Sequence, residues 1–306
     1  MTTNRIAPVR LDAEAIAALQ AWTGRQEQVQ DCLTVFPVRG LSATLNREDP
    51  EPVAATSGLN GNQGTELPAL WHWLNFLPYA NHDEIGEDGH PRRGGFLPPV
   101  PLPRRMWAGG RLRWQASNPL RVGQKVERHS RIASVKHKAG RSGELVFVLV
   151  EHQLRNAHGL AVSEEQDIVY RPAPQTGDAP AAPTAAETGA AWQRDVVPDP
   201  VLLFRYSALT FNGHRIHYDR SYATQEEGYP GLVVHGPLIA TLLADLVRRH
   251  MPDARLRAFD FRAARPTFDL HPFRLNGQPS ADGKTVRLWA NDHEGFLTMQ
   301  ALAILE

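Results

Sequence analysis

The sequence predicts an α+β protein made of two similar units, each an antiparallel sheet wrapped around a buried helix. The first observation is length, because 306 residues suit two domains of ordinary size. The second is a faint repeat, since residues 39–46 resemble residues 205–212. The third is order: each copy is followed by a polar stretch with Gly and Pro and then by an apolar segment. Such order indicates an internal duplication.

Two apolar segments predict the buried helices. Residues 67–77 carry Pro68 at an early helical position, and Pro78 follows them as a stop signal. Residues 237–247 place apolar side chains at helical spacing over a wide face, so we expect most of that helix to be buried. Gly236 suits the cap position before it.

Strand-like segments follow each predicted helix. Residues 145–150 and 167–170 flank a hairpin turn at 156–159, and residues 285–290 and 296–305 flank a turn at 291–295. A further strand-like run, residues 201–206, precedes the second helix. Because a sheet wrapped around a helix buries it most economically, we predict a double hotdog. Its parts are an N-terminal unit (1–171), an Ala- and Pro-rich linker (172–191) and a C-terminal unit (192–306).

The bulk composition restricts the partners. Lys and Arg together equal Asp and Glu at 33 each, so the chain has no overall attraction for nucleic acid or an anionic membrane, and we expect neither partner. The single cysteine, Cys32, excludes an intrachain disulfide. The first residues do not read as a signal peptide, and no apolar run approaches the roughly 18 residues of a membrane helix. A cytoplasmic protein is the expectation.

The densest polar cluster occupies residues 212–219 and suggests proton chemistry. Adding water to an unsaturated thioester needs a base, an acid and donors for the enolate oxygen. His217 can transfer a proton near neutral pH, and Asn212 can orient the water or the carbonyl. Asp219 is a candidate to fix the tautomer of the imidazole. His214 and Tyr218 are candidates for supporting roles, although histidine pairs are also common on surface turns.

The entry to the second helix, at His235 and Gly236, is a candidate oxyanion hole. Free backbone N–H groups and the positive end of the helix dipole collect there. The residues alone are equally well explained as a simple helix start. A metal site from His214, His217 and His235 is conceivable, but nothing fixes a tetrahedral set, and we predict no metal.

Arginines in both units are candidates for binding a substrate carboxylate or the phosphates of coenzyme A, because a guanidinium fork suits both groups. The common alternative is a solvated basic surface. From its position beyond the second helix we place Arg265 first; the other candidates are Arg262, Arg105 and Arg104.

The loop F-N-G-H-R-I-H-Y-D, residues 211–219, resembles the signature of the MaoC-like R-specific enoyl-CoA hydratases, G-D-x-N-P-x-H-x-D. His217 and Asp219 match it by type, whereas Asn212 stands at the position of the catalytic Asp and His214 at that of the Asn. The branch with type-2 hydroxyacyl-thioester dehydratases and mesaconyl-C(4)-CoA and itaconyl-CoA hydratases is more similar, also at residues 70–73 and 97–109.

The resemblance implies a lyase that reversibly hydrates a short dicarboxylic enoyl-CoA. Itaconyl-CoA or mesaconyl-C(4)-CoA would be the substrate, citramalyl-CoA the product, and no cofactor would be needed beyond the coenzyme A of the substrate. The alternatives are a dehydratase of fatty acid synthesis, a hotdog thioesterase and a non-catalytic acyl-CoA-binding protein. Residues 46–50, the first-unit counterpart of the loop, lack a histidine. We therefore expect a catalytically degenerate first unit, and a homodimer of such chains is plausible.

Overall fold

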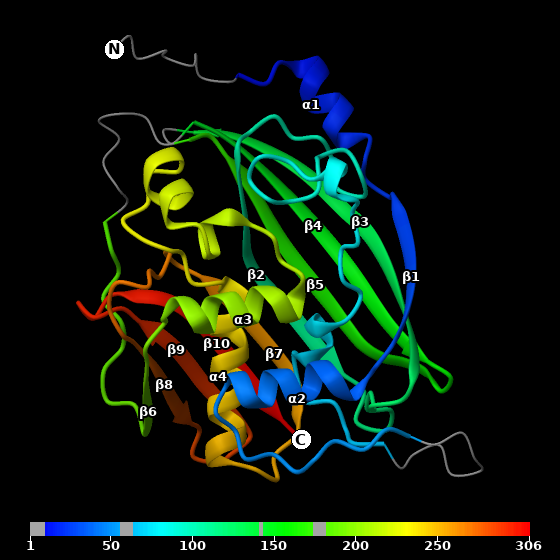
Figure 1. Cartoon of the computed structure of the whole chain (residues 1–306), viewed down its shortest axis with the longest axis vertical. Coiled ribbons are helices and arrows are strands. Elements are labelled where there is room, and N and C mark those ends of the chain that lie inside the picture. The colour runs from blue at the N-terminus through cyan, green and yellow to red at the C-terminus, as the bar shows by residue number, and fades with distance from the viewer. Residues whose placement is uncertain (1–9, 56–63, 141–142, 174–181) are drawn as a thin grey trace.

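The computed structural model describes residues 10–55, 64–140, 143–173 and 182–306. Its centre is one ten-stranded antiparallel sheet with the order β1-β3-β4-β5-β2-β7-β10-β9-β8-β6 (Figure 1). The strands before residue 172 occupy one side of that order, and those after residue 191 occupy the other. The two predicted sheets therefore join edge to edge, where β2 pairs with β7.

Four of the five strands of the first half, β2 to β5, are longer than any strand of the second half. The first five are β1 (Gln26–Cys32), β2 (Arg104–Trp114), β3 (Lys125–Gly140), β4 (Gly143–Asn156) and β5 (Gly159–Arg171). The second five are β6 (Trp192–Val196), β7 (Leu256–Ala263), β8 (Phe273–Pro279), β9 (Thr285–Asn291) and β10 (Leu297–Leu305). The strands predicted after each helix, and the two turns between them, lie within or beside β4, β5, β9 and β10, which confirms them.

Helix α4 (Gly236–His250) is the central helix of the second half. All ten residues from Leu238 to Val247 are buried, and the helix packs on β6, β8, β9 and β10. The predicted helix at 237–247 is therefore confirmed, although the residue in the cap position is His235 rather than Gly236.

The helix predicted at residues 67–77 is wrong. Only the 3₁₀ helix η1 (Trp71–Leu74) forms there, because Leu70 and Phe76 have left-handed φ values of 70° and 56° that interrupt an α-helix. His72 and Trp73 instead donate hydrogen bonds to the buried carboxylate of Glu164 in β5, at 2.9 and 3.0 Å. A charge on the sheet, and not helical periodicity, positions these side chains.

The strand predicted at residues 201–206 is also wrong, because this run lies in helix α3 (Pro200–Thr210). The side chain of Asp199 caps the helix by accepting from the N–H groups of Val201 and Leu202, and Pro200 suits the first turn. Helix α2 (Val35–Thr44) is its counterpart in the first half, and the two helices pack together. The repeat seen in the sequence thus reflects paired helices.

The stretch from Asn46 to Pro50 binds the first half to α4 through charges. Asp49 pairs with Arg248 at 3.1 Å and with Arg47, whose guanidinium also contacts Asp245 in the middle of α4. The Asp245 side chain is 1% exposed and receives two further arginines, Arg194 at 3.1 Å and Arg249 at 2.6 Å.

The remaining elements are α1 (Ala13–Gln20), η2 (His82–Glu84), η3 (Arg215–His217) and η4 (Tyr222–Glu226). Within the described ranges, no helix is long and apolar enough to cross a membrane.

Candidate active site

His217 lies in η3, just after α3 ends at the left-handed residue Phe211. Its ring is buried, and Nδ1 lies 2.7 Å from the backbone oxygen of Val233. Because a carbonyl only accepts hydrogen bonds, Nδ1 carries the hydrogen and Nε2 keeps a lone pair. Burial lowers the pKa of His217 to about 4, against the opposing effect of that hydrogen bond. At neutral pH the ring is therefore an uncharged proton acceptor.

His235 supports this ring from one side. The His217 and His235 rings stack with their centroids 3.7 Å apart and their planes 19° apart. Nε2 of His235 lies 2.8 Å from the hydroxyl oxygen of Ser207 in α3, whereas Nδ1 is buried without a hydrogen-bond partner in the described structure. Burial also lowers the pKa of His235 well below its usual value. The stack fixes the plane of the His217 ring beside the start of α4.

The first turn of α4 offers a backbone donor at this point. The first N–H groups of a helix have no partner within it, and Pro237 has none to offer, so Gly236 supplies the donor at the helix start. A Cβ added to Gly236 would meet nothing closer than the backbone oxygen of Trp107 at 3.9 Å. The predicted oxyanion role thus has both a donor and space, and it stays a prediction.

The side chain of Asn212 shapes the loop at residues 212–219. Its Oδ1 accepts a hydrogen bond from the backbone N–H of His214 at 3.0 Å. The His214 ring lies perpendicular to that of His217, with centroids 5.4 Å apart. Asn212 therefore helps to place His214 beside His217, and its predicted contact with water or the carbonyl is untested.

The role predicted for Asp219 is wrong. Its carboxylate accepts hydrogen bonds from Arg215, at 3.0 and 2.8 Å, and from the backbone N–H of Tyr222 at 3.0 Å. The partner that fixes the tautomer of His217 is the carbonyl of Val233. Asp219 acts on the backbone of the loop because η3 turns its side chain back toward Arg215.

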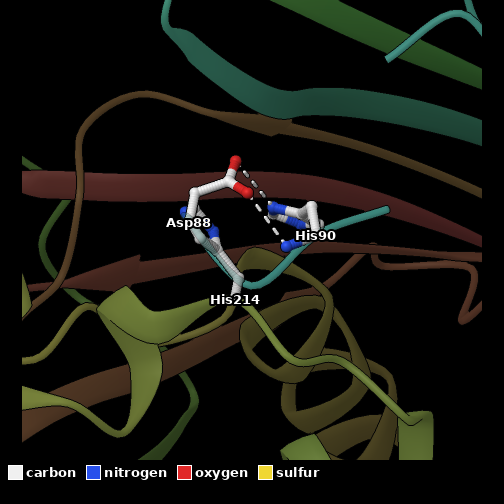
Figure 2. Close-up of side chains that lie close together, drawn as sticks. All are labelled: Asp88, His90 and His214. Carbon is white, nitrogen blue, oxygen red and sulfur yellow. Dashed lines mark hydrogen bonds and ion pairs between the residues drawn. The ribbon is translucent and has the colours of Figure 1, made fainter. Parts of the chain in front are cut away.

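Two residues from the first half enter the site, and the sequence reasoning missed them. Figure 2 shows Asp88 and His90 beside His214, and one ligand-type atom of each lies within 4.8 Å of the others. The His90 and His214 ring centroids are 4.1 Å apart. The only local signal is the Asp-Gly-His spacing at residues 88–90, and nothing in it reveals which loop it will meet.

Glycines allow the two loops to meet. Gly89 has a φ of 86°, and a Cβ there would lie 1.9 Å from the backbone oxygen of Gly213. Tyr218 is exposed, and its hydroxyl donates to that same oxygen at 2.9 Å. Neither Gly89 nor Gly213 tolerates a side chain without a shift of the backbone, so the two loops are held in fixed contact. The supporting role predicted for Tyr218 is one of loop structure.

Of the four candidate arginines, two are paired with carboxylates of the protein and a third lies on the outer face of the sheet. Arg265 pairs with Asp292 at 3.1 Å, and Arg104 pairs with Glu227 at 3.2 Å. Arg262 is exposed on β7, whereas its neighbour Phe261 is buried beneath it. Because successive strand residues point to opposite faces, Arg262 lies on the face away from α4. Its predicted role in binding a substrate carboxylate or coenzyme A stays a prediction.

Arg105 differs from these three. It lies on β2 opposite Tyr170 of β5, and no carboxylate of the described residues forms an ion pair with it. Burial is the main cause that lowers the pKa of His90 and of His214, and the positive charge of Arg105 contributes to both shifts. Among the described residues, Arg105 is therefore a guanidinium without a carboxylate partner whose charge acts on the histidine cluster.

Comparison with known proteins places the chain in a family. Residues 70–269 match the family model of the hydroxyacyl-thioester dehydratase type 2 proteins. The mesaconyl-C(4)-CoA hydratase of Chloroflexus aurantiacus is 49% identical over 284 residues, which cover 92% of this chain and 95% of that protein. The chain belongs to the hydroxyacyl-thioester dehydratase type 2 family and is a hydro-lyase.

Solved structures confirm the fold. A MaoC-like dehydratase has a TM-score of 0.69 at 15% identity and covers 94% of this chain and 99% of its own. A Mycobacterium tuberculosis protein with a double hotdog fold has a TM-score of 0.55 at 12% identity and covers 93% and 96%. The predicted α+β double hotdog is thereby confirmed, with the two sheets continuous through β2 and β7.

Proposed function

We propose that this protein hydrates a short enoyl-CoA that carries a second carboxylate, with mesaconyl-C(4)-CoA and itaconyl-CoA as the candidates. Hydration of either would give citramalyl-CoA, and the reaction is reversible. The observation that supports the proposal is the position of Arg105 on β2, opposite Tyr170. Its guanidinium has no carboxylate partner among the described residues, and its positive charge contributes to the lowered pKa values of His90 and His214. The similarity to a mesaconyl-C(4)-CoA hydratase supports the same class of substrate.

A substrate carboxylate would complete the charge balance at Arg105. An unpaired buried carboxylate costs several kcal/mol, so a site for a dicarboxylate requires a cation or several donors. A guanidinium can hold a carboxylate through two parallel hydrogen bonds, which fixes its orientation as well as its position. Arg265 was the first choice from the sequence, but its pairing with Asp292 leaves Arg105 as the better candidate.

The hydration of the conjugated thioester, mesaconyl-C(4)-CoA, then proceeds through His217. Itaconyl-CoA, whose double bond lies one carbon further from the thioester, must first lose a proton from its α-carbon and gain one at its terminal methylene carbon, which moves the double bond into conjugation. Nε2 of His217 takes a proton from water while the water oxygen bonds to the β-carbon. The electron pair of the double bond moves toward the α-carbon and the thioester oxygen, where the N–H group of Gly236 receives the developing negative charge. The proton then passes from His217 to the α-carbon, which returns His217 to its neutral state. No cofactor is needed beyond the coenzyme A of the substrate.

A comparison of three thioesters tests the proposal. Itaconyl-CoA and mesaconyl-C(4)-CoA carry the second carboxylate, and crotonyl-CoA lacks it. The loss of the conjugated thioester absorbance reports hydration of mesaconyl-C(4)-CoA and of crotonyl-CoA, and chromatographic detection of citramalyl-CoA reports that of itaconyl-CoA. We expect kcat/KM for crotonyl-CoA to be lower by about a hundredfold or more, since a site built for a charge strongly rejects a substrate that lacks it.

Other outcomes identify the alternatives. Equal activity on crotonyl-CoA would overturn the dicarboxylate proposal and indicate a general acyl hydratase. Activity confined to carrier-protein thioesters would indicate a dehydratase of fatty acid synthesis. Release of free thiol would indicate a thioesterase, and binding without any reaction would indicate a binding protein.

A further inference from the structure

The first half contributes a loop to the catalytic pocket although it lacks a catalytic loop of its own. The backbone oxygen of Asp88 accepts from the N–H of Arg215 at 2.9 Å, and the oxygen of Glu87 accepts from the Arg215 guanidinium at 3.1 Å. The close approach of Gly89 to Gly213 presses the loops together between these contacts. The Asp88–His90 segment is therefore fixed against the residues that position His217.

His90 is chemically distinct within the cluster. Four imidazoles lie together at this site, those of His90, His214, His217 and His235. Of these four rings, and among the described contacts, only that of His90 has a carboxylate partner. Oδ2 of Asp88 lies 3.4 Å from Nδ1 of His90. The same carboxylate accepts from the backbone N–H of His90 at 2.9 Å, which fixes the geometry of the pair.

His90 also remains accessible and acts on His217. Its side chain is 20% exposed, whereas His217 is 8% exposed. Burial is the largest cause that lowers the pKa of His217, and a positive charge on His90 would lower it further. His90 thus lies next to His214, whose ring lies beside that of His217, and its partly exposed side chain is open to a small molecule such as water.

The reacting water requires two hydrogen-bond acceptors, one for each of its hydrogens. Nε2 of His217 provides one. Asn212 stands where the MaoC-like signature has a carboxylate, and one of the two lone pairs of its amide oxygen already accepts from the backbone N–H of His214. We infer that His90 is the second acceptor, a catalytic residue that holds the reacting water opposite His217, and that Asp88 is its positioning residue.

A divalent cation is the competing occupant, because two imidazoles and a carboxylate are ordinary ligands for zinc. Two features favour water. The Asp88 carboxylate already accepts from His90, and two guanidinium groups, those of Arg105 and Arg93, place positive charge around His90. That charge opposes a bound cation and does not oppose a neutral water molecule.

Two substitutions of His90 test the inference on the full-length enzyme, with any enoyl-CoA that it hydrates. His90→Ala should lower kcat by about a hundredfold, the usual loss for a group that assists proton transfer. His90→Gln should recover part of that loss, because the amide oxygen still accepts a hydrogen bond from water. KM and the melting temperature should change little for the glutamine variant.

The pH profile of Asp88→Asn separates positioning from mere loop structure. The groups that face His90 are Asp88, His214, His217, Arg105 and Arg93. Of these, only Asp88 raises the pKa of His90, so its loss as a charge should move the acidic limb of kcat to lower pH. A residue that serves only to hold the loop would leave that limb in place.

The matched control is His129→Gln, since His129 pairs with Glu127 two residues away on β3, outside the site. It should leave kcat and the pH profile unchanged. Wild-type kcat in both His90 variants would overturn the inference. Loss of activity on treatment with EDTA and recovery with zinc, both absent from His90→Gln, would equally overturn it and assign the cluster to a metal.

Discussion

The carbonyl oxygen of Val233 accepts a hydrogen bond from Nδ1 of His217 at 2.7 Å, and this contact determines which nitrogen can react. With Nδ1 protonated, the lone pair of Nε2 is available to water. Replacing His217 with Ala should lower turnover by about a hundredfold or more, the usual contribution of general acid–base catalysis. Steady-state hydration of an enoyl-CoA measures the loss.

His158→Ala is the control for that substitution, because His158 is exposed at the tip of the β4–β5 turn. It should behave as wild type. A folded His217→Ala enzyme with near-normal turnover would remove His217 from the mechanism.

The pKa shifts predict a pH profile. Burial lowers the pKa of His217 to about 4, and it lowers the pKa of His90. Both rings are then neutral and active above the usual histidine value of about 6.5. We expect kcat/KM to be level between pH 7 and 8, with an acidic limb that lies below 6.5. A limb at or above 6.5 would contradict the neutral-base mechanism.

The free energy of unfolding should also decrease as the pH falls, and it must be measured separately from activity. The pKa of His152, like that of His217, is lowered to about 4 mainly by burial. Unfolded rings bind protons near 6.5, so below that pH the unfolded state binds more protons than the folded state. The contribution of these two rings to the free energy of unfolding should be fully present above about pH 6.5 and should decrease as the pH falls toward 4. Urea unfolding at each pH separates this loss from the kinetic limb.

Asn212 can be tested by two substitutions with opposite expectations. Asn212→Asp keeps the acceptor for the N–H of His214 and so should fold normally. It should also make the acidic limb of the pH profile steeper, because a carboxylate with the usual aspartate pKa of about 4 would titrate in the same range as His217. Asn212→Ala removes the acceptor, and turnover should fall by about tenfold, since a lost hydrogen bond of about 1 kcal/mol loosens the loop. Full activity of Asn212→Ala would limit Asn212 to a dispensable turn.

Local pattern predicted much of the fold and part of the site. Alternating apolar residues placed β4, β5, β9 and β10, and helical spacing placed α4. The errors at residues 67–77 and 201–206 have physical causes. Glu164, about 90 residues away, anchors His72 and Trp73, and the Asp199 cap converts an apolar run into a helix. Only the first of these depends on tertiary structure; the cap was readable and was missed.

The candidate loop at residues 212–219 could be recognised in the sequence because its polar residues lie within eight positions of one another. Asp88 and His90 could not, because they reach His214 from more than a hundred residues away through the contact of Gly89 with Gly213. Arg265 seemed the best partner for a carboxylate until the structure showed its pairing with Asp292. The sequence shows which side chains are close along the chain, but it does not show which charged groups already form ion pairs within the folded protein.

The unpaired state of Arg105 predicts a change of specificity. Arg105→Gln removes the charge and keeps hydrogen-bonding capacity, so kcat/KM for the dicarboxylic thioester should fall by about a hundredfold or more while that for crotonyl-CoA changes little. Arg265→Gln is the matched control, because Arg265 is already paired with Asp292. Equal losses on both substrates in Arg105→Gln would assign Arg105 to structure or to coenzyme A and not to the second carboxylate.

The last prediction concerns Asp245, the buried charge that joins the two halves. Its carboxylate contacts Arg47 from the first half and two arginines of the second, Arg194 and Arg249. Asp245→Ala would leave these guanidinium groups without their shared partner, and removing one side of a buried pair costs about 3–5 kcal/mol. We expect a loss of that size in urea unfolding.

Asp195→Ala is the control, because Asp195 pairs with Arg274 at the surface, with side chains 58% and 46% exposed. Exposed pairs contribute about 0–1 kcal/mol, so this variant should unfold almost as wild type does. Similar small losses in both variants would show that the charges on Asn46 to Pro50 do not hold the first half to α4.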